Sequence, residues 1–373
     1  MFEISQEAFD RLRLIRSGNI GPVSYRQLIK RYGSAARALE AIPSMAARGG
    51  RRSFRLAETN KIDLELQAMH HLGASLTFLN DPTYPSLLAE LSNAPPALLW
   101  KGRLNLLEKP IVAIVGARNA SAAACRFAQA LANSLVESGV SIVSGLAKGV
   151  DTAAHQGSLK KATIAVIAGG LDVFYPPENE RMQIEIAQRG LLLAEQPLGT
   201  EPRARHFPYR NRIIAGLARG TVVVEAAPRS GSLITARLAA EAGRQVMAVP
   251  GSPIDPRSKG CNMLIREGAT LVQSADDVLE LIQHFDERAE QANRHPNAET
   301  IDDDSDIGEP DQTEFEDMDR EPVIDLLSAT PVTVDELARQ SKFPVAAVQL
   351  TLLELELAGR LARHAGARVS LKN

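Results

Sequence analysis

Six basic residues lie at or beside glycine-containing turns, and their types and spacing suit them to hold phosphate groups. They are Arg118, Lys148, Arg210, Arg212, Arg229 and Lys259. Arginine and lysine donate charged hydrogen bonds to phosphate oxygens, and the free backbone amides of a turn before a helix add further donors. The expected ligand is therefore anionic and carries more than one phosphate.

The turns that carry these residues follow short apolar runs. Residues 111–115 form one such run, which breaks at Gly116 and leads through Ser121, a predicted helix cap, into a helical stretch. A strand, a glycine turn and a helix start leave backbone N–H groups pointing at an anion. The residues that we predict to bind phosphate or DNA are Gly116, Arg118, Ser144, Gly145, Lys148, Gly149, Phe174, Arg210, Asn211, Arg212, Arg229, Ser230, Gly231, Ser232, Lys259 and Asn262.

An alternation of strands and helices positions these turns. The pattern predicts an α/β fold with an extended Rossmann-like, doubly wound and mostly parallel sheet. Ligands of such sheets bind at the carboxyl ends of the strands, so we expect the turns to share one pocket or groove. Two further runs, 74–79 and 97–100, predict extra strands that flank the sheet. The main strands are expected at 111–115, 141–143, 163–168, 191–194, 221–225, 245–249 and 270–272.

Composition divides the 373 residues into four predicted segments. Residues 1–70 form a small helical domain of the helix-hairpin-helix (SAM-like) type, although a plain packing turn is the simpler explanation for its G-x-x-G-P sequence. Residues 71–285 form the sheet domain, and 322–373 a winged-helix-like domain. Between them, 286–321 form an acidic disordered linker with 15 Asp+Glu against 3 Arg. The remaining chain has 39 Lys+Arg against 30 Asp+Glu, a basic body that suits a polyanion.

The sequence lacks the residues that define several classes of enzyme. The dinucleotide fingerprint G-x-G-x-x-G is absent after residues 111–115, no G-x-x-x-x-G-K-[ST] occurs, and the two cysteines lack metal-site spacing. We therefore expect a non-enzyme without cofactor or metal ion. A cytoplasmic location is expected, because neither a signal peptide nor a membrane-spanning run is present. Five residues near strand ends could supply an acid or base for catalysis, but structural roles as caps, helix residues or arginine partners are favoured for them: Asp151, His155, Asp172, Glu195 and Glu225.

Six motifs are spaced in order along the sheet domain: GAR at 116–118, SGLAKGVD at 144–151, GGLDVFYP at 169–176, FPYRNRIIAGL at 207–217, RSGSLITA at 229–236 and GCNMLIREGA at 260–269. Together they resemble the motifs of the DNA-processing protein A (DprA/Smf) family. The resemblance implies sequence-independent binding of single-stranded DNA, a homodimer, and loading of the recombinase RecA during natural transformation. It also places Arg118, Lys148, Arg210 and Arg212 in the family's basic pocket. Phe174, Tyr175, Phe207 and Tyr209 are the nearest aromatic candidates for base stacking.

Two of these basic residues depart from the family pattern. Lys148 stands where many members have arginine, and Arg229 where many have lysine. Both exchanges keep the charge and change the hydrogen-bonding geometry. The resemblance therefore preserves an anion site and leaves its detailed contacts open.

Two other functions stay open at this point. The first is a nucleotide-processing enzyme of the lysine-decarboxylase-like phosphoribohydrolase type, although Thr235 replaces the glutamate of that family's P-G-G-x-G-T-x-x-E signature. The second is a DNA reader that works through residues 322–373. Its recognition helix, expected at 344–358, carries Glu354 and Glu356 and no basic residue, so phosphates would be repelled. Packing or partner binding is the favoured role for this helix.

Overall fold

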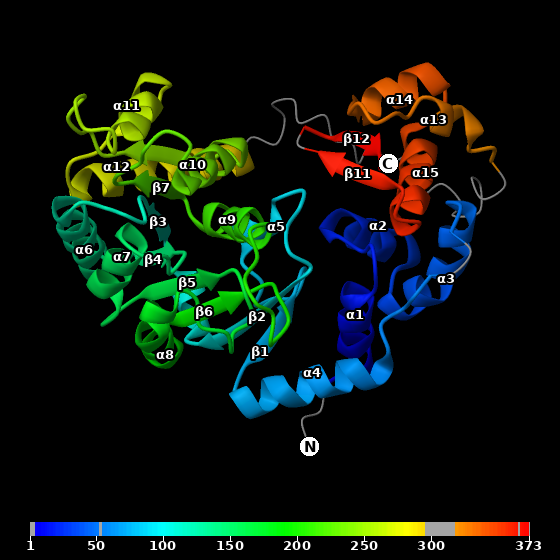
Figure 1. Ribbon diagram of the computed structural model, residues 1–373, viewed down its shortest axis with the longest axis horizontal. Helices are drawn as coiled ribbons and strands as arrows, with labels where there is room; N and C mark the ends of the chain where they lie inside the picture. Colours follow the sequence, from blue (N-terminus) through cyan, green and yellow to red (C-terminus); the bar gives the residue numbers. More distant parts are fainter. Residues whose placement is uncertain (1–3, 52–53, 295–317, 365, 373) are drawn as a thin grey trace. The chain divides into compact units, whose positions relative to one another are not determined.

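The computed structural model of the protein describes residues 4–51, 54–294, 318–364 and 366–372. They divide into two compact units, one of residues 65–300 and one that combines residues 1–64 with 301–373. Figure 1 colours the chain from blue to red along the sequence. Among the described helices, none has the length and apolar character needed to cross a membrane.

The larger unit contains a nine-stranded sheet. Its strands are β1 (Ser75–Phe78), β2 (Ala97–Gly102), β3 (Ile111–Val115), β4 (Ser141–Ser144), β5 (Thr163–Ile167), β6 (Leu191–Ala194), β7 (Gly220–Val223), β8 (Gln245–Ala248) and β9 (Thr270–Leu271). Their order is β1-β2-β6-β5-β4-β3-β7-β8-β9. The pairs β1–β2 and β2–β6 are antiparallel and the others are parallel. The predicted mostly parallel α/β sheet with two flanking strands is confirmed.

Helices cover both faces of this sheet (Figure 1). They are α5 (Ser86–Ala89), η1 (Leu104–Glu108), α6 (Ala122–Glu137), α7 (Val150–Ser158), η2 (Pro177–Asn179), α8 (Glu180–Arg189), α9 (His206–Leu217), α10 (Gly231–Glu241), α11 (Lys259–Arg266) and α12 (Ala275–Arg294). The chain steps from β3 through β4 and β5 to β6 in one direction, then crosses back to β7 beside β3. Because such crossovers are right-handed, α6 to α8 cover one face and α9 and α10 cover the other.

Local sequence explains the central strands and their turns. All five residues of β3 and of β5 are buried, as expected for strands with helices on both faces. The hydroxyl of Ser144 at the end of β4 donates to the carbonyl of Ile114 at 2.7 Å, which ties two strand ends together. Ser121 caps α6, since its Oγ accepts from the Ala124 amide at 3.0 Å.

The smaller unit combines segments from both ends of the chain. Its first segment has α1 (Gln6–Arg16), α2 (Pro22–Tyr32), α3 (Ala35–Arg48) and the start of α4 (Thr59–Leu72), which continues into the other unit. Its second segment has α13 (Glu321–Asp325), β10 (Val332–Thr333), α14 (Val334–Ser341), α15 (Val345–Leu357), β11 (Leu361–His364) and β12 (Arg368–Leu371). The strands pair in the order β10-β12-β11. The predicted helix-hairpin-helix and winged helix are both present, whereas β10 was not predicted because it is two residues long.

The predicted disordered linker needs correction at both ends. Helix α12 continues to Arg294, so disorder from residue 286 was wrong. The residues after 285 include glutamate, arginine, alanine and glutamine, which favour helix. At the other end, the largely buried side chain of Arg320 pairs with Glu354 at 3.1 Å. The rest of the predicted linker, 295–317, lies outside the described residues.

Candidate phosphate-binding site

A shallow pocket lies where β3, β4 and β5 end and α9 begins. Its volume is about 70 Å³, well below the roughly 300–1,000 Å³ of sites that enclose a drug-sized ligand. Three basic residues that the sequence predicted, Arg118, Lys148 and Arg210, line it together with Tyr175 and Phe207. Since strand ends and one helix supply the walls, the pocket is built on rigid elements, with room for a phosphate group or the edge of a base.

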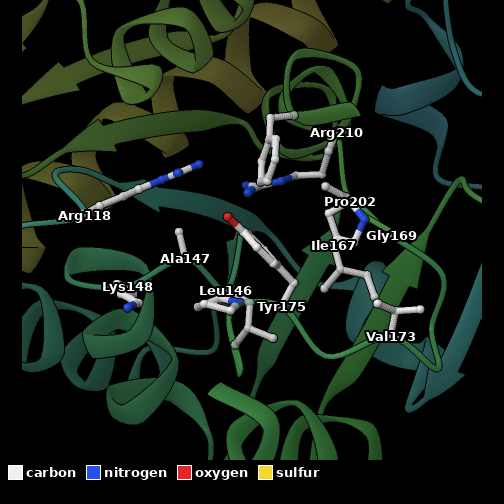
Figure 2. A pocket seen from close by; sticks show the side chains of 14 residues that line it. Arg118, Leu146, Ala147, Lys148, Ile167, Gly169, Val173, Tyr175, Pro202 and Arg210 are labelled. Atoms are coloured by element: carbon white, nitrogen blue, oxygen red, sulfur yellow. The ribbon is translucent and has the colours of Figure 1, made fainter. Parts of the chain in front are cut away.

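Two guanidinium groups converge on one aromatic ring in this pocket. The Cζ atoms of Arg118 and Arg210 lie 5.1 and 5.9 Å from the ring centroid of Phe207. The rings of Phe207 and Tyr175 are 5.7 Å apart, centroid to centroid. Figure 2 shows the Arg118 and Arg210 side chains pointing toward one another, with the Tyr175 hydroxyl directed to the space between them. Like charges repel at such separations, so the arrangement favours an anion between them.

Arg210 is held in place by a glycine and a buried carboxylate. Its side chain is only 7% exposed, and a Cβ at Gly145 would lie 1.5 Å from the Arg210 Nη1. The Asp151 carboxylate, also buried, accepts hydrogen bonds from the amides of Gly145 at 3.2 Å and Ala147 at 3.3 Å. The guanidinium of Arg210 therefore lies on the bare backbone of the turn after β4.

Burial and charge act in opposite directions on this pair. Burial lowers the pKa of Arg210, while the Asp151 carboxylate raises it and Arg118 lowers it. Burial likewise raises the pKa of Asp151, and Arg210 and the two amides oppose the rise. Each group thus stabilises the charged form of the other in a place where either alone would be costly.

Lys148 is the exposed cation of the pocket. Its Nζ lies 2.5 Å from Glu178 Oε1, and both side chains are more than half exposed. The next residue, Gly149, has a φ of 77° and caps the N-terminus of α7. A Cβ there would lie 2.3 Å from the Ala117 carbonyl oxygen, so only glycine fits this close approach between the turns after β3 and β4.

The turns after β7 and β8 do not line this pocket. Arg229 follows β7 and Lys259 begins α11, and both are exposed. The strands β5, β4, β3, β7 and β8 are neighbours in that order, and neighbouring strands are ~4.8 Å apart. The turn after β8 therefore lies roughly 20 Å from the turn after β5. The turns lie along one edge of the sheet, as expected, and those after β7 and β8 lie outside this pocket, so a groove shared by all of them stays a prediction.

Arg212 faces away from the pocket. It is 4% exposed, and its Nη2 lies 2.5 Å from Glu195 Oε1. On a helix with 3.6 residues per turn, residue 210 lies close to the same side as residue 207, whereas residue 212 lies about 140° away from residue 207. The predicted place of Arg212 in the basic pocket was therefore wrong. Its neighbour Asn211 is also buried, and its amide donates to the Gly231 carbonyl at 3.4 Å.

The remaining predicted residues lie behind the pocket or along the sheet edge and do not line it. Most have structural partners: Gly116 packs on Val150, Ser144 hydrogen-bonds to Ile114, Ser230 Oγ lies 2.6 Å from Ser232 Oγ, and Asn262 hydrogen-bonds to Gly251. Gly231 is the first residue of α10. The Phe174 side chain is 38% exposed.

Four of the five residues considered for catalysis make the kinds of contacts expected of structural residues. Asp172 accepts from the Gly199 amide at 2.8 Å, and Glu195 pairs with Arg212. Glu225 accepts from the Ser121 amide at 2.7 Å and lies 3.6 Å from Arg257. The predicted cap role of Asp151 was wrong, because α7 begins at Val150 and Asp151 is its second residue.

His155 is buried one turn into α7 and gives the fold a pH dependence. Its Nδ1 lies 2.7 Å from Thr163 Oγ1, and its Nε2 has no hydrogen-bond partner among the described residues. Burial, with a smaller effect of Arg210, lowers the pKa of His155 to about 3. An unfolded histidine has a pKa of about 6.5, so the unfolded chain binds a proton that the folded chain excludes.

We expect the free energy of unfolding to fall by about 1.4 kcal/mol per pH unit from this group as the pH drops below about 6.5. At pH 5 the loss is about 2 kcal/mol. Chemical denaturation of the wild type and a His155→Asn variant between pH 5 and 7.5 measures it, because the asparagine amide corresponds in position to Nδ1 beside Thr163 and does not titrate. Parallel pH profiles for the two proteins would contradict the assignment.

Comparison with known proteins gives matches along most of the chain. The family model of DNA recombination-mediator protein A matches residues 75–283, that of a DprA-like N-terminal HHH domain residues 5–68, and that of a DprA winged helix domain residues 308–367. The DNA processing protein DprA of Streptococcus pneumoniae is 52% identical over 201 residues, which cover 53% of this chain and 71% of that protein.

Two solved structures show the same similarity. The X-ray structure of DNA processing protein A from Streptococcus pneumoniae has a TM-score of 0.62 and 40% identity, and the match covers 75% of this chain and 98% of the other. DNA processing protein A from Helicobacter pylori, described for its single-stranded DNA binding mode, has a TM-score of 0.52 and 31% identity over 56% of this chain and 96% of its own.

Proposed function

This chain belongs to the DNA recombination-mediator protein A family, and we propose that it binds single-stranded DNA without recognising its sequence. The observation that carries the proposal is the convergence of Arg118 and Arg210 on the Phe207 ring. Two guanidinium groups and Lys148 hold a phosphate, while the Tyr175 and Phe207 rings offer faces to an unpaired base. Cations combined with stacking rings bind single strands of any sequence.

The spread of basic residues favours a polymer over a small nucleotide. The turns after β5 and β8 lie roughly 20 Å apart along the sheet edge, and exposed Arg229 and Lys259 lie on the side away from the pocket. A mononucleotide reaches only the pocket, whereas an extended strand reaches both regions. Phosphate contacts of this kind position a backbone and carry no sequence information.

The larger role that we propose is that of a recombination mediator. It includes loading of RecA onto incoming single strands during natural transformation, with the protein acting as a homodimer in the cytoplasm. The family relationship and the relatives' roles in DNA processing support this part of the proposal. A RecA filament-assembly assay on strands coated with single-strand-binding protein tests it, and assembly that this protein does not accelerate would contradict it.

We further propose that the protein is not an enzyme. Asp172, Glu195 and Glu225 are engaged by amides or arginines, which supports structural roles for them. Thr235, at the position of the catalytic-type glutamate of the phosphoribohydrolases, is 2% exposed within α10. Base release from nucleoside monophosphates by the purified protein would overturn this part of the proposal.

The test of DNA binding is one low-salt titration series. We expect a 30-nucleotide single strand to bind at least about 100-fold more tightly than a mononucleotide, because several phosphates release counterions together. Mixed-sequence and homopolymer strands should differ by only a few fold. Fluorescence anisotropy with single-stranded, duplex and mononucleotide ligands measures these ratios. Equal affinity for strand and mononucleotide, or a strong preference for one sequence, would reject the proposal.

A further inference from the structure

Helix α15 is the helix that a winged helix would place on DNA, yet nine of its 13 residues are buried. Its buried residues include Val348, Leu352 and Leu355, which join the core of the winged-helix segment. A second set, Leu350, Leu353 and Leu357, joins the core of helices α1 to α3. Buried residues on two sides of one helix require two covering surfaces. The side of α15 that its own segment leaves uncovered is thus covered by the N-terminal helices.

A buried carboxylate also connects the two segments. Glu354 is 1% exposed, and its Oε1 lies 2.6 Å from the Nε of Arg48 on α3, while Oε2 lies 3.1 Å from the Nε of Arg320. An ionised carboxylate is costly to bury unless charged donors surround it. Arg320 belongs to the same C-terminal segment, but Arg48 comes only with the N-terminal helices.

The backbones of the two segments also meet closely. A Cβ at Gly49 would lie 2.1 Å from the carbonyl oxygen of Glu354, so only a glycine allows this approach. The guanidinium of Arg360 donates to the Gly49 carbonyl at 3.2 Å. Side-chain packing, an ion pair and backbone contact therefore coincide on one surface.

The hairpin turn between α1 and α2 lies at the carboxyl end of α15. Asn19, in the left-handed region with φ of 59°, donates through Nδ2 to the Leu357 carbonyl at 3.1 Å. The carboxyl end of a helix carries unpaired carbonyls and partial negative charge. A turn of the type that elsewhere holds a nucleic-acid phosphate thus contacts the negative end of a protein helix.

We infer that α15 is a docking helix whose partner is the N-terminal helical segment of this chain. Docking covers the helix and the turn through which the two end segments would otherwise contact nucleic acid. The two segments then act as one closed unit, and DNA binding is left to the site on the sheet. The docking contacts lie within the smaller unit alone, and only the statement that DNA binding is left to the sheet rests on the proposed function.

The test uses the full chain with a protease site inserted after residue 305. After cleavage under native conditions, the C-terminal fragment should co-elute with the rest in equimolar amount on size exclusion. Arg48→Glu places a second carboxylate beside Glu354 and should weaken retention at least about 100-fold. Arg37→Glu, at an exposed position on the same helix, is the matched control and should retain the fragment.

Hydrogen exchange on the uncut proteins gives a second measurement. Amides of residues 18–21 and 350–357 should be protected in the wild type and in Arg37→Glu, and should exchange faster in Arg48→Glu, while the sheet keeps its protection. Loss of the fragment from the cleaved wild-type protein, or equal exchange in the two variants, would overturn the inference. Leu353→Glu, which changes the apolar part of the same surface, should reproduce the effect of Arg48→Glu.

Discussion

Replacing Gly145 with alanine should weaken single-stranded DNA binding roughly 10- to 100-fold, the effect of losing charged hydrogen bonds to a phosphate. The added Cβ would lie 1.5 Å from the Arg210 Nη1, so the guanidinium must leave its place. Arg210 is 7% exposed and faces the buried Asp151 carboxylate. Displacing it weakens the positive charge that opposes the rise in the Asp151 pKa, so the free energy of unfolding should also fall.

The measurement for this variant combines fluorescence anisotropy with urea denaturation. The control is Gly18→Ala, because Gly18 has open space around its Cβ position and no left-handed φ. Gly18→Ala should change neither the affinity for single-stranded DNA nor the midpoint of urea unfolding. A Gly145→Ala protein with wild-type affinity and stability would show that Arg210 does not lie on the turn after β4.

The double replacement Arg118→Ala with Lys148→Ala should have the second large effect. Both side chains are exposed cations of the pocket, and each releases about one counterion on a single strand. The slope of log K against log salt should become shallower by about 1.4, or 0.7 for each lost contact. Affinity at low salt should fall by about 10- to 100-fold, and the difference should narrow as salt rises.

A matched pair of surface cations controls for net charge. Arg237 and Lys161 each pair with a glutamate at the surface, Glu241 and Glu137, and neither lines the pocket. Changing both to alanine removes the same charge and should leave the slope within error of the wild type. Equal slopes for the two double variants would remove Arg118 and Lys148 from the binding site.

The strands were predictable because a strand that is buried on both faces appears in the sequence as an unbroken run of apolar residues. Residues 111–115 and 191–194 match β3 and β6 at both ends, since helices on both faces require apolar residues throughout. Other strand ends differ by one or two residues. By contrast, β10 has two residues and is held by pairing with distant β12, so no local pattern marks it.

The pocket was only partly predictable, because tertiary contacts decide which residues meet. Arg210 and Arg212 are equivalent in the sequence Arg-Asn-Arg, and only the direction of α9 places the first in the pocket and the second beside Glu195. Of the four aromatic candidates, Tyr175 and Phe207 line the pocket, whereas Phe174 and Tyr209 do not. To place the turns after β7 and β8 outside the pocket, the strand order had to be known, and composition does not reveal it.

The recognition helix shows the opposite case, in which a local pattern was informative. Glu354 and Glu356 argued against DNA contact and for packing, and Glu354 is buried between Arg48 and Arg320. The structure adds that α15 is covered on two sides, by its own segment and by the N-terminal helices. Which segment provides the second surface could not be predicted, because Arg48 is separated from Glu354 by 306 residues.

The contact between Gly145 and Arg210 also limits how this protein can change over evolutionary time. Any side chain at 145 would occupy the space of the Arg210 guanidinium, so the two positions cannot vary independently. A larger residue at 145 would require the Arg210 guanidinium to shift off the turn after β4, and the buried Asp151 would then lose part of the positive charge that opposes its pKa rise. Substitutions at these three positions should therefore be coupled in their effects on stability.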